Sequence, residues 1–374
     1  MSLRVVPVGD SRTLARAFVE VPWTIYEGDR NWVPPLTSMA LRTVNRRRNR
    51  FHRHAQVEHF VLFDDGRATG RVAATIYPAY NERYGSRSGF FGFFEAPPDP
   101  ACARLLLRTA EEWLESRGMK QSMGPFNYCS TQEMGLLVEG FDEGPAAFQT
   151  YNPPYYRELL ETNGYQPLYT MRTFRWTFTE QGEQLREVIE AGTAAMAAAG
   201  FHTRPFNRRR FRRDARLFRE LFNASFAENT DVLPYEEDVF DELISQMKPF
   251  IDGDLISFVE KEGEAVAFTA MVPNFNETLA RLNGTIGPLD LLRFRRYRKE
   301  IDSAVLLLVG ALPDARGGIG LGLVAELGRK LSESRYETLH GTWIHDENAP
   351  SRSLADGFGA VPNKRYAILG RELT

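Results

Sequence analysis

Cysteine and long apolar runs are scarce in this sequence, and each shortage excludes a class of protein. Cys102 and Cys129 are the only cysteines, too few for a secreted disulfide scaffold or a cysteine-based metal site, so we expect a cytoplasmic setting. No apolar run is long enough to span a bilayer, and we expect no signal peptide after Met1. His-Glu-x-x-His and Gly-x-Ser-x-Gly patterns are also lacking, which argues against a zinc protease and a serine hydrolase.

Excess charge of either sign is lacking too, since the formal net charge of the 374 residues is −3. This balance gives no general attraction to nucleic acid or to an anionic membrane, so we expect no DNA and no membrane as partners, and it disfavours tRNA. With 43% hydrophobic residues, the chain has enough apolar side chains for two cores. We predict two domains, residues 1–178 and 179–374, in a monomer or homodimer.

The segment from Ser303 to Ala360 predicts a strand, a glycine-rich turn and a helix in succession. Residues 304–312 are apolar and end at Pro313, which is typical of a buried strand. Asp-Ala-Arg-Gly-Gly-Ile-Gly-Leu-Gly follows, and apolar residues then recur at helical spacing up to Leu331. Glycines let consecutive backbone N–H groups converge on an anion, and a helix N-terminus adds the positive end of its dipole. The turn is therefore predicted to bind an anion.

This order of elements resembles the GNAT superfamily of acyl-coenzyme A acyltransferases. The family pattern is a strand, then Arg/Gln-x-x-Gly-x-Gly/Ala opening a helix, then Asn-x-x-Ala/Ser-x-x-x-Tyr-x-x-x-Gly-Phe. Gly318 and Gly320 occupy the glycine positions of this pattern, and Asn348 and Ser351 stand at the expected spacing. The chain departs from it at the tyrosine that often protonates the departing thiolate, where it has Ala355.

The resemblance implies that acetyl-CoA or another acyl-CoA binds at this segment, with its pyrophosphate on the turn and its pantetheine along the preceding strand. The Arg/Gln position holds Ala315, one place before an arginine. The predicted cofactor residues are Val309, Ala311, Arg316, Gly317, Gly318, Ile319, Gly320, Leu321 and Gly322. The catalytic candidates are Asn348 and Ser351, ranked first, and Tyr366, with His345 among the polar groups nearby. Asn348 and Ser351 are also the residues that would cap a short helix.

Two matches at one offset indicate an internal duplication. A strand, an acidic-glycine turn and a second strand end at Ile76, and the same pattern ends 196 residues later at Val272. Asn152 and Asn348 begin similar strings at the same offset. With the resemblance, this predicts an α/β (α+β) chain of two tandem GNAT-like folds, each with a mixed central sheet flanked by helices.

The first copy lacks the glycine turn. Its corresponding loop, residues 96–100, contains three prolines, which remove backbone N–H donors, so we expect no cofactor there. It has instead an extra segment, residues 124–142, in which polar side chains alternate with aromatic residues and glycines. This segment also resembles one shared by a poorly characterised group of bacterial proteins of similar length. Such a composition is typical of a small-molecule pocket and equally of a self-satisfied Ω-type loop. In the pocket interpretation, the acceptor contacts Asn127, Glu133, Asn152 and Tyr155.

The function predicted from these features is acyl transfer from acyl-CoA, most simply acetyl-CoA, to the amine of a small molecule. A Fem-type transferase that uses aminoacyl-tRNA is a first alternative, although the net charge disfavours tRNA. A non-catalytic acyl-CoA-binding module is the second. Two arginine-rich stretches, residues 208–213 and 293–299, are explained by solvated helix faces or by contacts to the coenzyme A 3′-phosphate or an anionic substrate.

Overall fold

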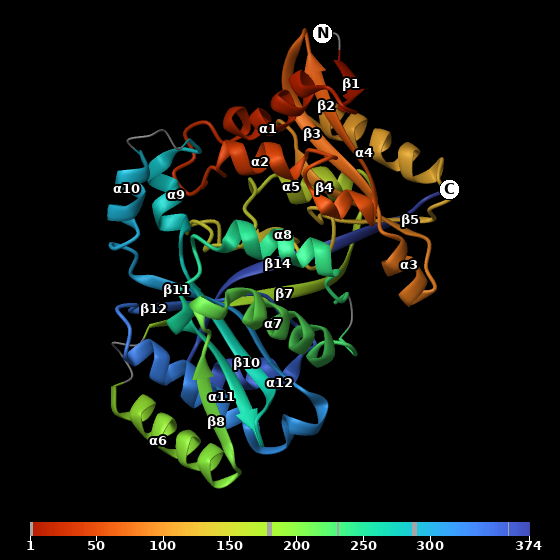
Figure 1. Cartoon of the computed structure of the whole chain (residues 1–374). Coiled ribbons are helices and arrows are strands. Elements are labelled where there is room, and N and C mark those ends of the chain that lie inside the picture. Colours follow the sequence, from red (N-terminus) through yellow and green to blue (C-terminus); the bar gives the residue numbers. More distant parts are fainter. Residues whose placement is uncertain (1–2, 178–181, 230–231, 286–289, 358) are drawn as a thin grey trace. The chain divides into compact units, whose positions relative to one another are not determined.

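The computed structural model describes residues 3–177, 182–229, 232–285, 290–357 and 359–374. The chain forms two compact units (Figure 1). Unit 1 consists of Met1–Arg172, Thr278–Phe294 and Lys364–Thr374, and unit 2 of Thr173–Glu277 and Arg295–Asn363. The predicted boundary after residue 178 falls among residues 178–181, outside the described residues, and stays a prediction.

Unit 1 is built around a mixed sheet in the order β1-β2-β3-β4-β5-β14, with β6 pairing β14. Only β4 and β5 pair in parallel; the other registers within the unit are antiparallel. The bounds of its elements are β1 (Leu3–Pro7), α1 (Arg12–Ile25), α2 (Thr37–Thr43), η1 (Arg50–Arg53), β2 (Gln56–Asp64), β3 (Arg67–Ile76), α3 (Pro78–Tyr84), β4 (Ser88–Glu95), α4 (Pro100–Glu115), β5 (Gln121–Gly124), β6 (Leu136–Glu139), α5 (Tyr156–Thr162) and β14 (Val361–Glu372).

Unit 1 has a hydrophobic core on each face of its sheet, because neighbouring residues of a strand point to opposite faces. On one face, Leu62 and Phe91 join Leu106 of α4. On the other, Val61 and Ala73 join Phe18 of α1. Both cores consist of almost fully buried side chains, so the strands of this sheet are held from both sides.

Unit 2 repeats this plan, with the strand order β8-β9-β10-β11-β12-β7 and β13 pairing β7. Here β11 and β12 form the parallel pair. The bounds are β7 (Gln166–Thr177), α6 (Gly182–Ala198), β8 (Phe201–Pro205), η3 (Arg208–Arg210), α7 (Phe211–Ser225), α8 (Glu237–Met247), η4 (Gly253–Leu255), β9 (Ile256–Lys261), β10 (Glu264–Pro273), α9 (Asn276–Leu282), α10 (Asp290–Tyr297), β11 (Ser303–Ala311), η5 (Pro313–Ala315), α11 (Arg316–Ser332), β12 (Thr338–Gly341), β13 (Ile344–His345) and α12 (Ala349–Gly357). Four elements, β7, α9, α10 and β14, contain residues of both units.

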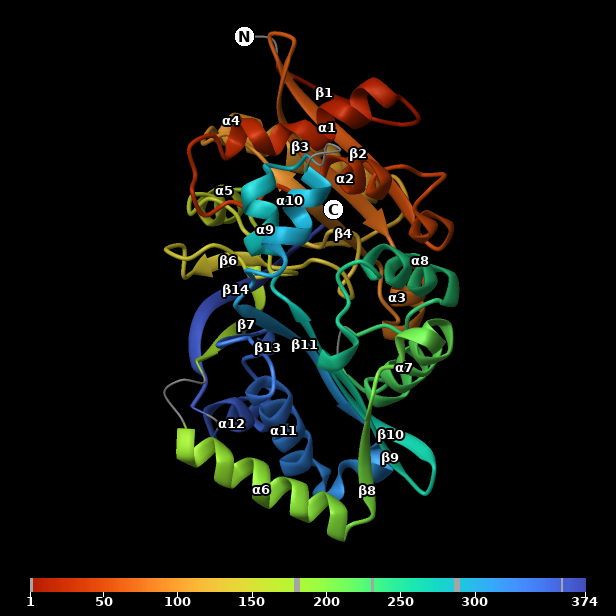
Figure 2. The ribbon, with the colours of Figure 1, turned by 60° about the vertical axis from the view of Figure 1, so that its left-hand side comes forward.

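The two faces of the unit 2 sheet are covered by different helices. Phe258 and Phe268 pack with Phe222 of α7, whereas Val259 and Ala267 pack with the side of α11 that carries Leu323. Helices α6 and α11 lie side by side (Figure 2). This arrangement leaves the start of α11 at the end of β11.

The predicted duplication is confirmed as a repeat of strand order, since β1–β5 correspond in position to β8–β12. The sixth strand of each unit is exchanged. β14, from the end of the chain, pairs with β5 in unit 1, and β7, from the end of the first repeat, pairs with β12 in unit 2. Each unit therefore needs residues from both repeats.

One predicted element differs from the structure. The stretch predicted as a glycine-rich turn, residues 314–322, is mostly helical, because α11 already begins at Arg316. Glycine disfavours helix by about 1 kcal/mol per residue, but buried Ile319 and Leu323 hold this first part of the helix on the sheet. The amides of the predicted turn are therefore those of a helix N-terminus.

Candidate functional site

The candidate site in unit 2 lies where β11 and β12 separate. Their parallel register runs only from Ser303 to Leu306, and the hydroxyl of Thr342 then donates to the Leu307 carbonyl over 3.0 Å. The rest of β11, including Val309 and Ala311, pairs with β10 on its other side and has no strand partner toward β12 among the described residues. A half-exposed strand edge therefore leads to the start of α11.

The N-terminus of α11 has no side-chain cap among the described residues. Its N-cap residue is Ala315, where Ser, Thr, Asp or Asn would normally accept a hydrogen bond from the first turn. The first turn also contains no acidic residue. Since the first N–H groups of a helix have no partner within it and carry partial positive charge, this end is suited to an anion.

The glycines of α11 have two different environments. A Cβ at Gly320 would meet nothing within 4 Å, so this position is open. A Cβ at Gly322 would lie 2.0 Å from Cγ of Met196, so glycine is required there by the packing of α6 against α11. The structure thus explains Gly322, a predicted cofactor residue, by helix packing, whereas it leaves Gly320 free of any packing role.

The corresponding place in unit 1 is filled by the chain itself. After the short register of β4 with β5, the amide of Phe126 donates to the Phe91 carbonyl over 2.8 Å, and the side chain of Asn127 accepts from the Phe93 amide over 2.7 Å. The N-terminus of α4 is capped by the carboxylate of Asp99, which accepts from Ala101. These contacts occupy the strand edge and the helix amides that unit 2 leaves open.

Of the four predicted acceptor residues, Asn127 and Glu133 are brought together. Nδ2 of Asn127 donates to Oε2 of Glu133 over 2.8 Å, and the Asn127 amide donates to the Glu133 carbonyl over the same distance. With Oδ1 on the Phe93 amide, Asn127 connects β4 to the loop that follows β5. Phe93 has a φ of 49°, which is unusual for a bulky residue, and its backbone amide is the one that donates to the Asn127 side chain.

The other two, Asn152 and Tyr155, also bond to backbone. Asn152 accepts from the Leu137 amide over 2.7 Å and donates to the Leu137 carbonyl over 3.2 Å. The hydroxyl of Tyr155 donates to the Ala96 carbonyl over 2.9 Å, and burial raises the pKa of this phenol to about 12. The contacts of all four residues are those of a self-satisfied loop, and their role in acceptor binding stays a prediction.

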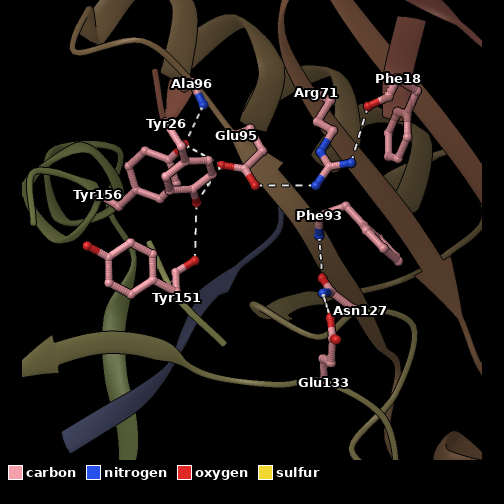
Figure 3. A network of polar contacts seen from close by, with 10 residues as sticks. All are labelled: Phe18, Tyr26, Arg71, Phe93, Glu95, Ala96, Asn127, Glu133, Tyr151 and Tyr156. Atoms are coloured by element: carbon pink, nitrogen blue, oxygen red, sulfur yellow. Dashed lines mark hydrogen bonds and ion pairs between the residues drawn. The ribbon is translucent and has the colours of Figure 1, made fainter. Parts of the chain in front are cut away.

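A buried carboxylate at the end of β4, Glu95, was missed by the sequence analysis. Figure 3 shows it between Tyr26, Arg71 and Tyr156. Oε2 accepts hydrogen bonds from the hydroxyls of Tyr156, over 2.6 Å, and Tyr26, over 3.0 Å. Arg71 donates to Oε1 over 3.3 Å and to the Phe18 carbonyl over 3.2 Å. The network joins β3, β4, α1 and α5.

Burial dominates the electrostatics of this network. It raises the pKa of Glu95, although Arg71 and the two hydroxyls act in the opposite direction. Burial and the Glu95 charge together raise the pKa values of Tyr26 and Tyr156. A charged residue ending the apolar run Gly89–Phe94 was the available sequence signal, because an unpaired carboxylate is rarely buried.

The catalytic candidates lie in different environments. Asn348 precedes α12, and its Oδ1 accepts from the Ser351 amide over 3.1 Å, which is the contact of a helix N-cap. Tyr366 is fully buried in unit 1, where its hydroxyl donates to the Thr150 carbonyl over 3.2 Å and burial raises its pKa. Nδ1 of His345 accepts from the Glu347 amide over 3.3 Å. The structure does not test a catalytic role for any of them.

The described residues lack two other kinds of feature, a metal-binding cluster and a membrane-spanning helix. They contain no group of three or more His, Cys, Asp or Glu side chains arranged to hold a metal ion. Nor does any helix among them have the length and apolar character needed to cross a membrane.

No protein-family model matches the chain. Among curated proteins, it is 29% identical over 375 residues to Protein YghO of Escherichia coli strain K12, covering 96% of this chain and 93% of that protein. It is also 29% identical over 384 residues to the bacterial ceramide synthase of Caulobacter vibrioides, covering 99% and 98% of the two chains.

Solved structures show the same architecture at low sequence identity. A tandem GNAT protein from the clavulanic acid biosynthesis pathway aligns with a TM-score of 0.58 and 11% identity, over 100% of this chain and 99% of that one. A GCN5-related N-acetyltransferase from Sphaerobacter thermophilus aligns with a TM-score of 0.51 and 13% identity, over 99% and 96%. The chain therefore has the tandem GNAT-like fold, as its sequence motifs predicted.

Proposed function

We propose that this protein transfers an acyl group from acyl-CoA to a primary amine, and that unit 2 binds the coenzyme. The observation that carries the proposal is the uncapped N-terminus of α11 beside the unpaired edge of β11. A diphosphate would accept hydrogen bonds from the first amides of α11, and Arg316 would add positive charge. The pantetheine amides would pair with the β11 backbone near Val309 and Ala311, in the manner of an added strand.

This placement puts the thioester at the separation of β11 and β12. There the amine nitrogen would attack the thioester carbonyl carbon, the C–N bond would form, and the C–S bond would break with release of coenzyme A thiolate. The ammonium has to lose a proton before attack, and the thiolate has to gain one. His345, which follows β12, is our candidate for accepting the amine proton.

For the acceptor we propose a long-chain amino alcohol, and for the donor a long-chain acyl-CoA. The support is the similarity over nearly the whole chain to a protein named bacterial ceramide synthase, because a ceramide is the amide of a fatty acid with such an amine. An acetyl donor and a small polar amine, the simplest expectation from the sequence, form the competing pair.

A donor and acceptor panel tests this proposal. Purified full-length protein is incubated with acetyl-, octanoyl- or palmitoyl-CoA and with sphinganine or spermidine, the released thiol is measured, and amides are identified by mass spectrometry. We expect thiol release and amide formation with palmitoyl-CoA and sphinganine. Acyl-CoA binding without turnover of any pair would instead indicate a binding module, and absence of both binding and turnover would refute the proposal.

A further inference from the structure

Unit 2 carries a cluster of exposed cations that the acyl-transfer site does not use. We define the α7 arginine cluster as the exposed residues of η3 and the start of α7 that share this charge, namely Arg208, Arg209, Arg210, Arg212, Arg213 and Arg216. Their guanidinium groups form no ion pair or hydrogen bond with any described residue. They are thus unlike Arg16, Arg108 and Arg157, each of which pairs with a glutamate four residues later.

The acidic residues of η3 and α7 themselves are two, Asp214 and Glu220, and Asp252 and Asp254 flank Gly253, which lies against the Arg208 side chain. Asp214 is buried and bonds to Arg204 over 2.9 Å and to the Asn207 amide over 2.8 Å. Glu237 of α8 lies 3.5 Å from Arg219. Glu220 is exposed on α7 and is the remaining carboxylate on this helix. Residues 208–225 contain seven arginines and two carboxylates, so this segment carries a net positive charge.

This placement of positive charge does not stabilise helix α7. Cations at a helix N-terminus oppose the helix dipole, and like charges three or four residues apart, such as Arg212 with Arg216 and Arg213 with Arg216, repel each other. The helix is held by its other side, where Leu221 and Phe222 enter the core. Guanidinium groups that oppose the helix dipole and form no ion pair with the described residues point to a partner outside the chain.

We infer that the α7 arginine cluster docks this protein onto an anionic phospholipid surface. Clusters of four to eight basic residues on an amphipathic helix have the charge complementarity for anionic headgroups. The choice of a membrane rests on the proposed function, because a long-chain amine and its amide reside in a bilayer. The net charge of −3, which predicted no membrane partner, is a sum over the chain and does not describe this local surface.

A single-stranded RNA is the alternative anionic partner, and the surface is less suited to it. RNA-binding surfaces combine cations with aromatic platforms on which bases stack. The exposed large apolar residues within the described ranges are Leu168, Leu321 and Val361, none of which is aromatic. Phe211, within the cluster's own helix, packs against Phe206 instead.

Vesicle binding tests the inference. We expect the full-length protein to co-sediment with phosphatidylglycerol–phosphatidylcholine vesicles, not with phosphatidylcholine alone, and to be released by salt. The variant R212Q/R213Q/R216Q should bind about 100-fold more weakly, since each basic residue contributes about fivefold at such a surface. The matched variant R16Q/R108Q/R157Q removes the same charge from paired arginines and should bind like wild type.

Three results would overturn the inference: no phosphatidylglycerol-dependent binding, equal losses in both triple variants, or tighter binding of poly(U) RNA than of the vesicles. Acyl transfer in detergent micelles is measured in parallel, and both variants should retain it. A loss confined to R212Q/R213Q/R216Q in micelles would assign the cluster to substrate binding and also overturn the inference. Because the vesicle assay involves no acyl transfer, failure of the proposed function would appear only in the micelle assay.

Discussion

Replacing Gly320 with leucine should stabilise the protein and abolish acyl-CoA binding. The position is helical, and a Cβ there meets no atom within 4 Å. Removing a helix-interior glycine should therefore raise the free energy of unfolding by about 0.7 kcal/mol, or the melting temperature by about 2 °C for a unit of this size. A helical side chain leans toward the preceding turn, so leucine would cover the amides that begin at Arg316.

Thermal unfolding with and without ligand measures both effects. At an acyl-CoA concentration of about 100 Kd, binding should stabilise the wild type by about 2.7 kcal/mol, which corresponds to about 5–10 °C. Gly320→Leu should melt slightly higher than wild type without ligand and show no further rise with it. A higher melting temperature without ligand shows that the variant is folded, so the missing acyl-CoA shift then reports loss of the binding site alone.

Two other glycines serve as controls. Gly182 of α6 is equally open, so Gly182→Leu should leave the acyl-CoA shift intact. Gly322→Ala would place a Cβ 2.0 Å from Met196 and should lower stability by about 1–3 kcal/mol through overpacking. A wild-type acyl-CoA shift in Gly320→Leu would refute the assignment of the α11 amides to the coenzyme.

Other predictions concern unit 1 and α12. Gly92→Ala should destabilise the protein by about 2 kcal/mol or more, seen in urea unfolding, because its Cβ would lie 1.8 Å from the Phe126 carbonyl oxygen; unchanged stability would show that the segment moves freely. Burial raises the pKa of Glu95, so its contribution to stability is present below the ordinary pKa of 4.5 and is lost as pH rises through the folded-state pKa. The stability advantage of wild type over Glu95→Gln should therefore shrink from acidic to neutral pH, and an advantage that grows would contradict this. Asn348→Ala should cost about 1 kcal/mol while Asn348→Asp keeps the cap; full acyl-transfer activity in Asn348→Asp would exclude a catalytic amide.

Local patterns were sufficient to predict most of the elements. The two hairpins ending at Ile76 and Val272 form as β2–β3 and β9–β10, as their turn residues predicted. These features depend on residues close together in the chain, so the turn residues and the hydrophobic periodicity of the segment are sufficient to predict them. The start of α11 was placed too late, because the packing of Ile319 on distant strands outweighs glycine's preference for a turn.

Some features of the candidate site could likewise be predicted from the sequence, and others could not. Residue pattern and spacing are enough to predict that an apolar strand leads into a glycine-containing helix N-terminus and that the chain repeats one plan. The folded chain is needed to show that the α11 amides have no side-chain cap while Asp99 caps α4, and that the Phe126 amide bonds to the strand edge of unit 1. It also assembled Glu95 with Tyr26 and Tyr156, residues 69 and 61 positions away. Such contacts depend on which strands become neighbours, and a burial-driven pairing between distant segments leaves no periodic signal in the sequence around either one.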